Sequence, residues 1–226
     1  MKTKTIKTIL SKKFESWLKS IPKEAEALRE RIKKNTMITG GAITSMLLGE
    51  KVEDYDFYFR DKATTLAVAR YYVAKFNAIN PDYKFKDGRK LSSVQVMEGL
   101  CRNGTDRVAI MVRSAGVASS SRMNDYQYFE TLEPGSPEQE GFIEEAMAVK
   151  KREEKAEKAP YMPIFLTSNA ITLSNNVQLI LRFFGEPDEI HKNYDFVHCM
   201  NYWTSWDNEL VLRKDSLEAI LGKELT

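Results

Sequence analysis

Residues 38–60 carry the side chains of this sequence whose types and spacing could do chemistry. Asp54 and Asp56 stand two positions apart in a segment of strand-like composition. Residues two apart in a strand point to the same face, roughly 6.6 Å apart along the chain. Two neighbouring carboxylates repel each other unless a positive charge lies between them, and hard divalent cations prefer oxygen ligands. The pair therefore predicts a metal site.

A glycine pair, Gly40 and Gly41, precedes a short apolar segment that is expected to be a helix. Glycine lets the backbone approach a phosphate closely, and the start of a helix points free N–H groups at it. Thr44 and Ser45 would add hydroxyl donors. A phosphate-binding turn beside paired carboxylates is the minimal equipment for metal-assisted phosphoryl or nucleotidyl transfer.

Hydrophobic periodicity and turn residues predict the elements that position these side chains. Two helices are expected within 8–34, the second of them capped by Ser20. Further helices are expected over 42–48, 61–77, 136–159, 187–193 and from 215 to the end. Strands are expected over 37–39, 54–60, parts of 84–122, 164–173, 177–184, 194–203 and 209–213. In the strand 54–60, Tyr55, Phe57 and Phe59 would face away from the aspartates. The last helix shows no stop signal, so the natural chain is expected to continue.

The length and charge of the chain limit its class. Its 226 residues fit one large or two small domains, and a net charge of +2 gives no global attraction to nucleic acid. Residues 84–122 hold a local excess of eight basic over three acidic side chains. A contact with RNA or a triphosphate is expected there, although a solvated sheet face is equally compatible. The basic residues are Lys84, Lys86, Arg89, Lys90, Arg102, Arg107, Arg113 and Arg122.

Cysteine usage and the N-terminus indicate a cytoplasmic protein. Cys101 and Cys199 are far apart and without metal-type spacing, which is typical of a reducing compartment. The first residues lack the apolar core of a signal peptide, and no apolar run is long enough to cross a bilayer.

The glycine pair, twelve intervening residues and Asp54-Tyr55-Asp56 resemble the signature of the DNA polymerase β-like nucleotidyltransferase superfamily. The similarity is greatest to the head domain of CCA-adding enzymes and bacterial poly(A) polymerases, and it extends to nucleotidyltransferase-like proteins of bacteriophages. The matching positions are Gly40, Gly41, Ile43, Leu47, Leu48, Gly49, Asp54 and Asp56. Thr44 and Ser45 depart from the pattern, because the family has an Arg-Asp pair there that handles the incoming nucleotide.

This resemblance implies an α+β fold of the polymerase β-like type, a mixed β-sheet flanked by helices with a β-rich and helical insertion. It implies a single domain at 1–226, with N-terminal helices at 1–36, a core at 37–77, the insertion at 78–160 and core completion at 161–226. A strand–helix–strand element over 177–196 is similar to one that brings a third carboxylate beside the first two. Asp195 would be that carboxylate. Separately from the resemblance, Arg182 lies on a strand expected to neighbour Asp195 and could contact a phosphate, with a surface arginine as the alternative.

The activity that the resemblance implies is transfer of a nucleoside monophosphate from an NTP, such as ATP, to an acceptor hydroxyl with release of pyrophosphate. Mg²⁺ or Mn²⁺ would be held by Asp54, Asp56 and Asp195, and the acceptor would be an RNA 3′ end, tRNA-like, in the cytoplasm of a host. Two alternatives remain open. One is a toxin or regulator type that modifies a protein or a tRNA, and the other is a non-catalytic interaction module with residues 150–158 as its contact surface.

Other candidate residues have a structural interpretation that is preferred. Tyr202, Trp203 and Trp206 could stack a base, but core packing is expected. His198 is expected to be a core histidine, and His191 is expected to face solvent near a helix end.

Overall fold

The computed structural model describes residues 2–79, 94–100, 104, 106–112 and 160–222. The expected helix at 136–159, the charged segment within it and most of the basic residues of the 84–122 region lie outside these ranges. Those basic residues are Lys84, Lys86, Arg89, Lys90, Arg102, Arg113 and Arg122.

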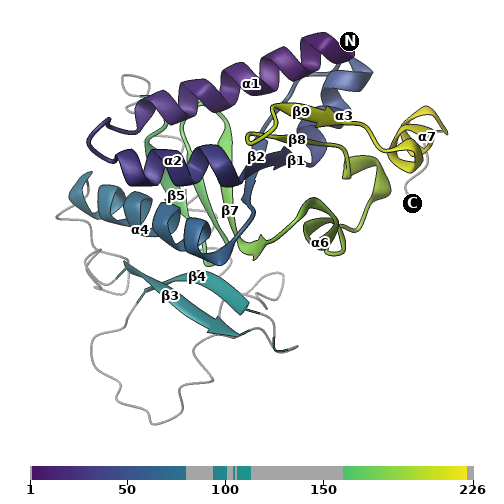
Figure 1. The fold of residues 1–226 in the computed structure, drawn as a ribbon. Coiled ribbons are helices and arrows are strands. Elements are labelled where there is room, and N and C mark those ends of the chain that lie inside the picture. The colour runs from purple at the N-terminus through teal and green to yellow at the C-terminus, as the bar shows by residue number, and fades with distance from the viewer. Residues whose placement is uncertain (1, 80–93, 101–103, 105, 113–159, 223–226) are drawn as a thin grey trace, which may run out of the picture.

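A seven-stranded mixed sheet forms the centre of the described chain, with strand order β5-β6-β7-β2-β1-β8-β9 (Figure 1). Its strands are β1 (Thr36–Thr39), β2 (Tyr55–Phe59), β5 (Pro163–Leu166), β6 (Ala170–Leu173), β7 (Val177–Phe184), β8 (Tyr202–Thr204) and β9 (Glu209–Val211). Strand β2 is central, because it pairs antiparallel with β1 on one side and parallel with β7 on the other. The predicted α+β class, with a mixed sheet flanked by helices, is therefore confirmed.

Three long helices cover one face of the sheet (Figure 1). They are α1 (Thr3–Ser20), α2 (Glu26–Asn35) and α4 (Lys62–Ile79). On the sheet below them, Phe57 and Phe59 are fully buried, as the alternation in the sequence predicts. The Trp17 ring meets Phe57 edge-on at 5.0 Å between centroids, and its indole N–H donates to Tyr72 Oη at 2.8 Å. Burial on this face holds β2 in place.

The opposite face of β2 carries Asp56 and Tyr58, because alternate residues of a strand point to opposite sides. A smaller apolar cluster of Met37, Tyr58 and Ile190 lies there. The short helix α6 (Pro187–His191) contributes Ile190 to it. The remaining short elements are α3 (Gly41–Leu48), the 3₁₀ turn η2 (Val197–Cys199) and α7 (Lys214–Gly222).

A two-stranded hairpin lies beside α4, formed by β3 (Val94–Leu100) and β4 (Asp106–Val112) (Figure 1). Val94 pairs with Val112, in line with the predicted alternation. Arg107 on β4 is only 7% exposed, and its Nη2 donates to Asn169 Oδ1 at 2.8 Å. Arg107 therefore does not belong to an exposed basic surface.

The expected strand at 194–203 is wrong for most of its length. Tyr194, Asp195 and Phe196 form a bend between α6 and η2, and only Tyr202–Thr204 is a strand. Short-range hydrogen bonds take the backbone groups that a strand would have used: Tyr194 N–H donates to His191 O, and Cys199 N–H donates to Phe196 O. The apolar composition of this segment resembles a strand, but its residues pack in a turn.

Two further boundaries differ from expectation. Residues 164–173 form two strands rather than one, because Thr167 Oγ1 accepts the amides of Asn169 and Ala170 in a side-chain turn. Ser20 does not cap α2, which begins at Glu26; its hydroxyl donates back to Trp17 O within the end of α1. The predicted β6–β7 hairpin is confirmed.

Candidate functional site

The turn between β1 and α3 is held in a conformation that requires glycine. Gly40 has φ +93° and ψ −159°, a region that residues with a side chain essentially do not occupy. Its N–H donates to Cys199 O at 3.1 Å, which ties the turn to η2. Ile43 and Met46 of α3 are buried in the main core. The first amides of a helix have no partner within the helix, and Gly41, the first residue of α3, lines the pocket described below.

Asp56 lies directly against this turn. A Cβ atom placed on Gly40 would be 2.8 Å from Asp56 Oδ2, so only glycine leaves room for the carboxylate. Strand pairing explains the proximity, because Thr39, which precedes Gly40, is the partner of Asp56 across β1 and β2. The structure therefore brings together the glycine pair and one of the two aspartates that the sequence singled out.

The electrostatics of Asp56 are unusual for a carboxyl group. Burial, and then the charge of Asp54, raise the pKa of Asp56 to about 6. Asp54 immediately precedes β2 and is exposed. A carboxyl group in this setting is stabilised in its charged form by any cation that binds beside it.

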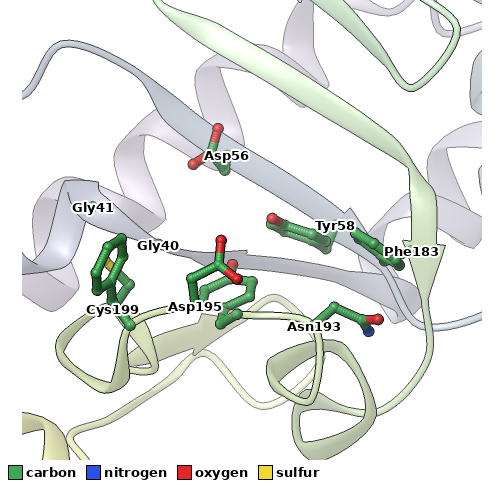
Figure 2. Close-up of a pocket in the computed structure, with 10 residues that line it drawn as sticks. Gly40, Gly41, Asp56, Tyr58, Phe183, Asn193, Asp195 and Cys199 are labelled. Carbon is green, nitrogen blue, oxygen red and sulfur yellow. The ribbon is translucent and has the colours of Figure 1, made fainter. Parts of the chain in front are cut away.

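Asp195 reaches the same pocket from a loop. The pocket has a volume of about 260 Å³, and Figure 2 shows Asp195 on the loop that faces the strand carrying Asp56. The residues that line it are Gly40, Gly41, Asp56, Tyr58, Phe183, Asn193, Tyr194, Asp195, Phe196 and Cys199. Asp195 therefore lines the same pocket as Asp56, from a loop and not from the neighbouring strand that was expected. The residue beside Asp56 on the adjacent strand β7 is the neutral Gln178.

The described residues supply only some of the ligands that a bound metal ion would need. No group of three or more histidine, cysteine or acidic residues that could hold a metal ion occurs within the described ranges. Asp56 and Asp195 line one pocket, and the charge of Asp54 acts on Asp56. These oxygen donors have the chemistry that Mg²⁺ or Mn²⁺ prefers, and phosphate oxygens and water would have to complete the coordination.

Three residues predicted to bind phosphate do not line the pocket. Thr44 is buried and its Oγ1 donates to His198 O at 2.7 Å, so its hydroxyl is already used. Ser45 is half-buried further along α3. Arg182 on β7 places its guanidinium 5.1 Å from the centre of the Phe183 ring. Of the residues that were expected to hold phosphate, only the two glycines are at the pocket.

Tyr194 was missed by the sequence analysis. Its hydroxyl is buried, and no described group meets it in normal hydrogen-bond geometry, although the hydroxyls of Tyr58 and Thr39 are near neighbours. Burial raises the pKa of Tyr194 far above its ordinary value. The hydroxyl would lie 3.7 Å from a Cβ on Gly40. An aromatic residue in an apolar run gives no signal in the sequence that it forms the wall of a pocket.

His191 is buried rather than facing solvent, which corrects the expectation for it. Its Nε2 lies 2.9 Å from Thr39 Oγ1, which donates its own proton to Asn201 O at 2.8 Å. The imidazole therefore carries its proton on Nε2 and donates it to Thr39. Burial, followed by the charge of Arg213, lowers the pKa of His191 to about 4. His191 supports the residue immediately before the glycine turn. His198 is half-buried in η2, so it is not the core histidine that was expected.

The aromatic cluster expected at the end of the chain belongs mainly to the core. Trp203 is buried, as expected, and its indole N–H donates to Asn208 Oδ1 at 3.0 Å. Trp206 lies under the guanidinium of Arg60, 4.8 Å from its ring centre. Tyr202 packs on His191 at 5.6 Å between ring centroids. None of the three lines the pocket.

The helices within the described ranges include no candidate membrane-spanning segment.

Comparison with known families corrects the assignment made from the sequence motif. The family model that matches residues 8–223 is described as "Gabija anti-defense 2 family protein". No nucleotidyltransferase family matches, so the assignment of the chain to the polymerase β-like superfamily is wrong. No curated protein matches the chain. No solved structure matches it either.

Proposed function

The chain belongs to the Gabija anti-defense 2 family, and we propose that it acts against the Gabija defence by metal-dependent nucleotidyl transfer. In this reaction a hydroxyl of an acceptor attacks the α-phosphorus of an NTP. The new bond is a phosphoester, and the bond to pyrophosphate breaks. The proposal rests on the chemistry of the pocket and not on membership of a nucleotidyltransferase family.

One observation carries the proposal: the Asp56 carboxylate lies against Gly40, and both residues line one pocket with Gly41, the first residue of α3. A phosphate bound at the helix start would lie close to that carboxylate, and the two negative groups would repel each other. The arrangement is stable only with a cation between them. A triphosphate bound together with a divalent metal satisfies this requirement, whereas a phosphate without a metal does not.

Each residue of the site has a role in this scheme. Asp56 and Asp54 would hold Mg²⁺ or Mn²⁺, which supplies charge neutralisation of the triphosphate and of the departing pyrophosphate. Asp195, exposed across the pocket, would help to bind metal and accept the proton of the attacking hydroxyl. The start of α3 would bind the phosphates. Positioning and electrostatics then provide most of the acceleration.

The acceptor is the hydroxyl of an RNA 3′ end or of a protein side chain that the defence needs. The basic residues of the 84–113 segment, other than the buried Arg107, would help to bind an RNA acceptor. The reaction would take place in the cytoplasm, where NTP and Mg²⁺ are present. A finer fold assignment also belongs to the proposal: β1, α3, β2 and β7 would form a core of polymerase β-like type, with the pocket on one face.

The proposal is tested by incubating the purified protein with each labelled NTP, Mg²⁺ and an extract of cells that carry the Gabija defence. We expect label in RNA or in protein. Asp56→Asn should reduce the transfer by about 100-fold or more, because it removes a charge that acts at the reacting centre. The variant should still fold, since burial already disfavours the charged form of this group.

Glu53→Gln is the matched control. Glu53 is also an acid of the segment before β2, but its carboxylate is exposed and pairs with Lys51 at 3.0 Å, outside the pocket. This variant should transfer the labelled nucleotide at the same rate as the wild type. Absence of label with every NTP, or full transfer by Asp56→Asn, would show that the pocket does not perform this reaction.

A non-catalytic interaction protein is the second candidate, and the neutral Gln178 beside Asp56 favours it, because a cluster of three carboxylates is not formed among the described residues. A defence assay separates the two candidates. Cells carrying the defence and expressing Asp56→Asn should lose the anti-defence effect if catalysis is required, and retain it if binding alone is sufficient.

A further inference from the structure

Phe196 is an exposed aromatic side chain at the edge of the pocket. Five large apolar side chains of the described chain are strongly exposed: Leu48, Ile79, Leu100, Phe196 and Leu221. Of these, Phe196 alone lines the pocket, and it is 44% exposed. Ligand pockets are lined largely by apolar and aromatic side chains with a few polar groups, so an exposed aromatic ring at the pocket is available to contact a bound ligand.

The size of the pocket indicates which part of a ligand would meet Phe196. Its volume of about 260 Å³ is below the usual range of ligand pockets, roughly 300–1,000 Å³. A nucleoside triphosphate bound by its phosphates at the start of α3 would therefore extend beyond the pocket. The base would lie at the rim, where the aromatic ring is exposed.

The residues that follow Phe196 connect it to the Gly40–Gly41 turn. The Phe196 ring packs on the His198 ring with 5.4 Å between centroids and 31° between planes. Within η2, which follows directly, Cys199 O accepts the Gly40 amide. His198 O accepts hydroxyls from Thr44 of α3 and Ser216 of α7. These contacts link the segment that carries Phe196 to the Gly40–Gly41 turn.

We infer that Phe196 is the surface on which the base of a nucleoside triphosphate stacks while its phosphates occupy the Gly40–Gly41 turn. This inference rests on the proposed function, because it names the binding mode of the same substrate. Stacking is tolerant of base identity, since every base has a π face. The Asn193 side-chain amide, which also lines the pocket, already donates to the carbonyls of Glu189 and Ile190. All four nucleotides should therefore bind, with the larger purines binding more tightly.

Calorimetry with a non-hydrolysable ATP analogue and with inorganic tripolyphosphate, both in Mg²⁺, tests the inference. Phe196→Ala should weaken binding of the analogue by about 10-fold or more, which corresponds to loss of one stacked base. Binding of tripolyphosphate, which has no base, should not change. Phe196→Trp should retain or increase affinity for the analogue. Leu221→Ala, which truncates an exposed apolar side chain outside the pocket, should bind both ligands as the wild type does.

The outcomes separate this inference from the proposed function. Equal binding of the analogue by wild type and Phe196→Ala overturns the inference, even if nucleotidyl transfer is observed. An equal loss of both ligands overturns it as well, because Phe196 would then act only on the structure. Absence of nucleotide binding by the wild type also contradicts it. Binding of the analogue that depends on Phe196, without transfer to any acceptor, supports the inference and contradicts the proposed transferase activity.

Discussion

At the scale of single residues, the site depends on the absence of one side chain. Gly40 supplies a backbone conformation available almost only to glycine, and it leaves space for the Asp56 carboxylate. Gly41, the first residue of α3, has no atom within 4 Å of the place that a Cβ would occupy. A side chain at position 40 would therefore be strained and would meet Asp56, whereas a side chain at position 41 would have free space.

Gly40→Ala is expected to lower the free energy of unfolding by about 1–3 kcal/mol, because its φ is strained for any other residue and its Cβ would overlap Asp56 Oδ2. Gly41→Ala should be neutral or slightly stabilising, because alanine favours the helix. Chemical denaturation monitored by tryptophan fluorescence measures both values. Equal stability of the two variants would contradict the role given to Gly40.

At the scale of elements, the segment from α6 to η2 supports the glycine turn through a polar network. Thr39 at the end of β1 contacts the His191 imidazole of α6 and the backbone of Asn201. Asn201 is fully buried, donates to Ser216 of α7 and accepts the Arg213 amide. Strand β1 is thus joined behind the turn to α6 and α7, which follow it by about 150 residues or more in the sequence.

This network makes stability sensitive to acid. Burial first, and then Arg213, hold the pKa of His191 at about 4 in the folded protein, against opposing effects of Asp188 and Asp215. The ordinary pKa of histidine, about 6.5, applies in the unfolded chain. The unfolded state therefore binds more protons between these values. The contribution of neutral His191 to the free energy of unfolding is fully present above pH 6.5. It decreases as the pH falls toward 4, by at most about 3 kcal/mol.

The pH dependence is measured by denaturation between pH 4 and 8, with wild type and His191→Gln compared. The substitution keeps polar groups near Thr39 but removes the titration. The decrease in stability between pH 6.5 and 4 should therefore be smaller in the variant. Identical pH profiles would show that His191 does not control this decrease.

At the scale of the whole molecule, the two faces of the sheet differ in what they contact. The face under α1, α2 and α4 (Figure 1) forms the main apolar core. The opposite face of β2 contributes Asp56 and Tyr58 to the pocket. Strand β2 takes part in both, since Phe57 points into the core and Asp56 into the pocket. The position of the carboxylate therefore depends on packing on the other side of the sheet.

Trp17→Ala is expected to lower the free energy of unfolding by about 3–5 kcal/mol, because it removes a fully buried indole from above Phe57 and leaves the Tyr72 hydroxyl without its donor. Trp17→Phe should lower the free energy of unfolding less, since an aromatic ring remains above Phe57. Thermal unfolding of both variants checks this order. A larger loss for phenylalanine than for alanine would contradict the packing described for Trp17.

The sequence by itself determined the local features of this protein. The glycine pair before a helix, the left-handed end of that helix at Gly49, the alternation of Asp56 with Phe57 and the hairpin at Asn175-Asn176 were predictable. These features depend on the backbone preferences of glycine and asparagine and on the two-residue period of a strand. Neighbouring residues specify them.

The tertiary structure alone decided which distant groups complete the pocket. Asp195 and Phe196 lie on a bend and not on a strand, and the neutral Gln178 lies beside Asp56. The Thr44 hydroxyl donates to η2, and His191 is buried against Thr39. The last three of these outcomes depend on contacts between segments more than 100 residues apart, whereas short-range hydrogen bonds close the bend. Composition and spacing do not encode which partner a polar group will find, because that choice is made by the packing of the whole sheet with its helices.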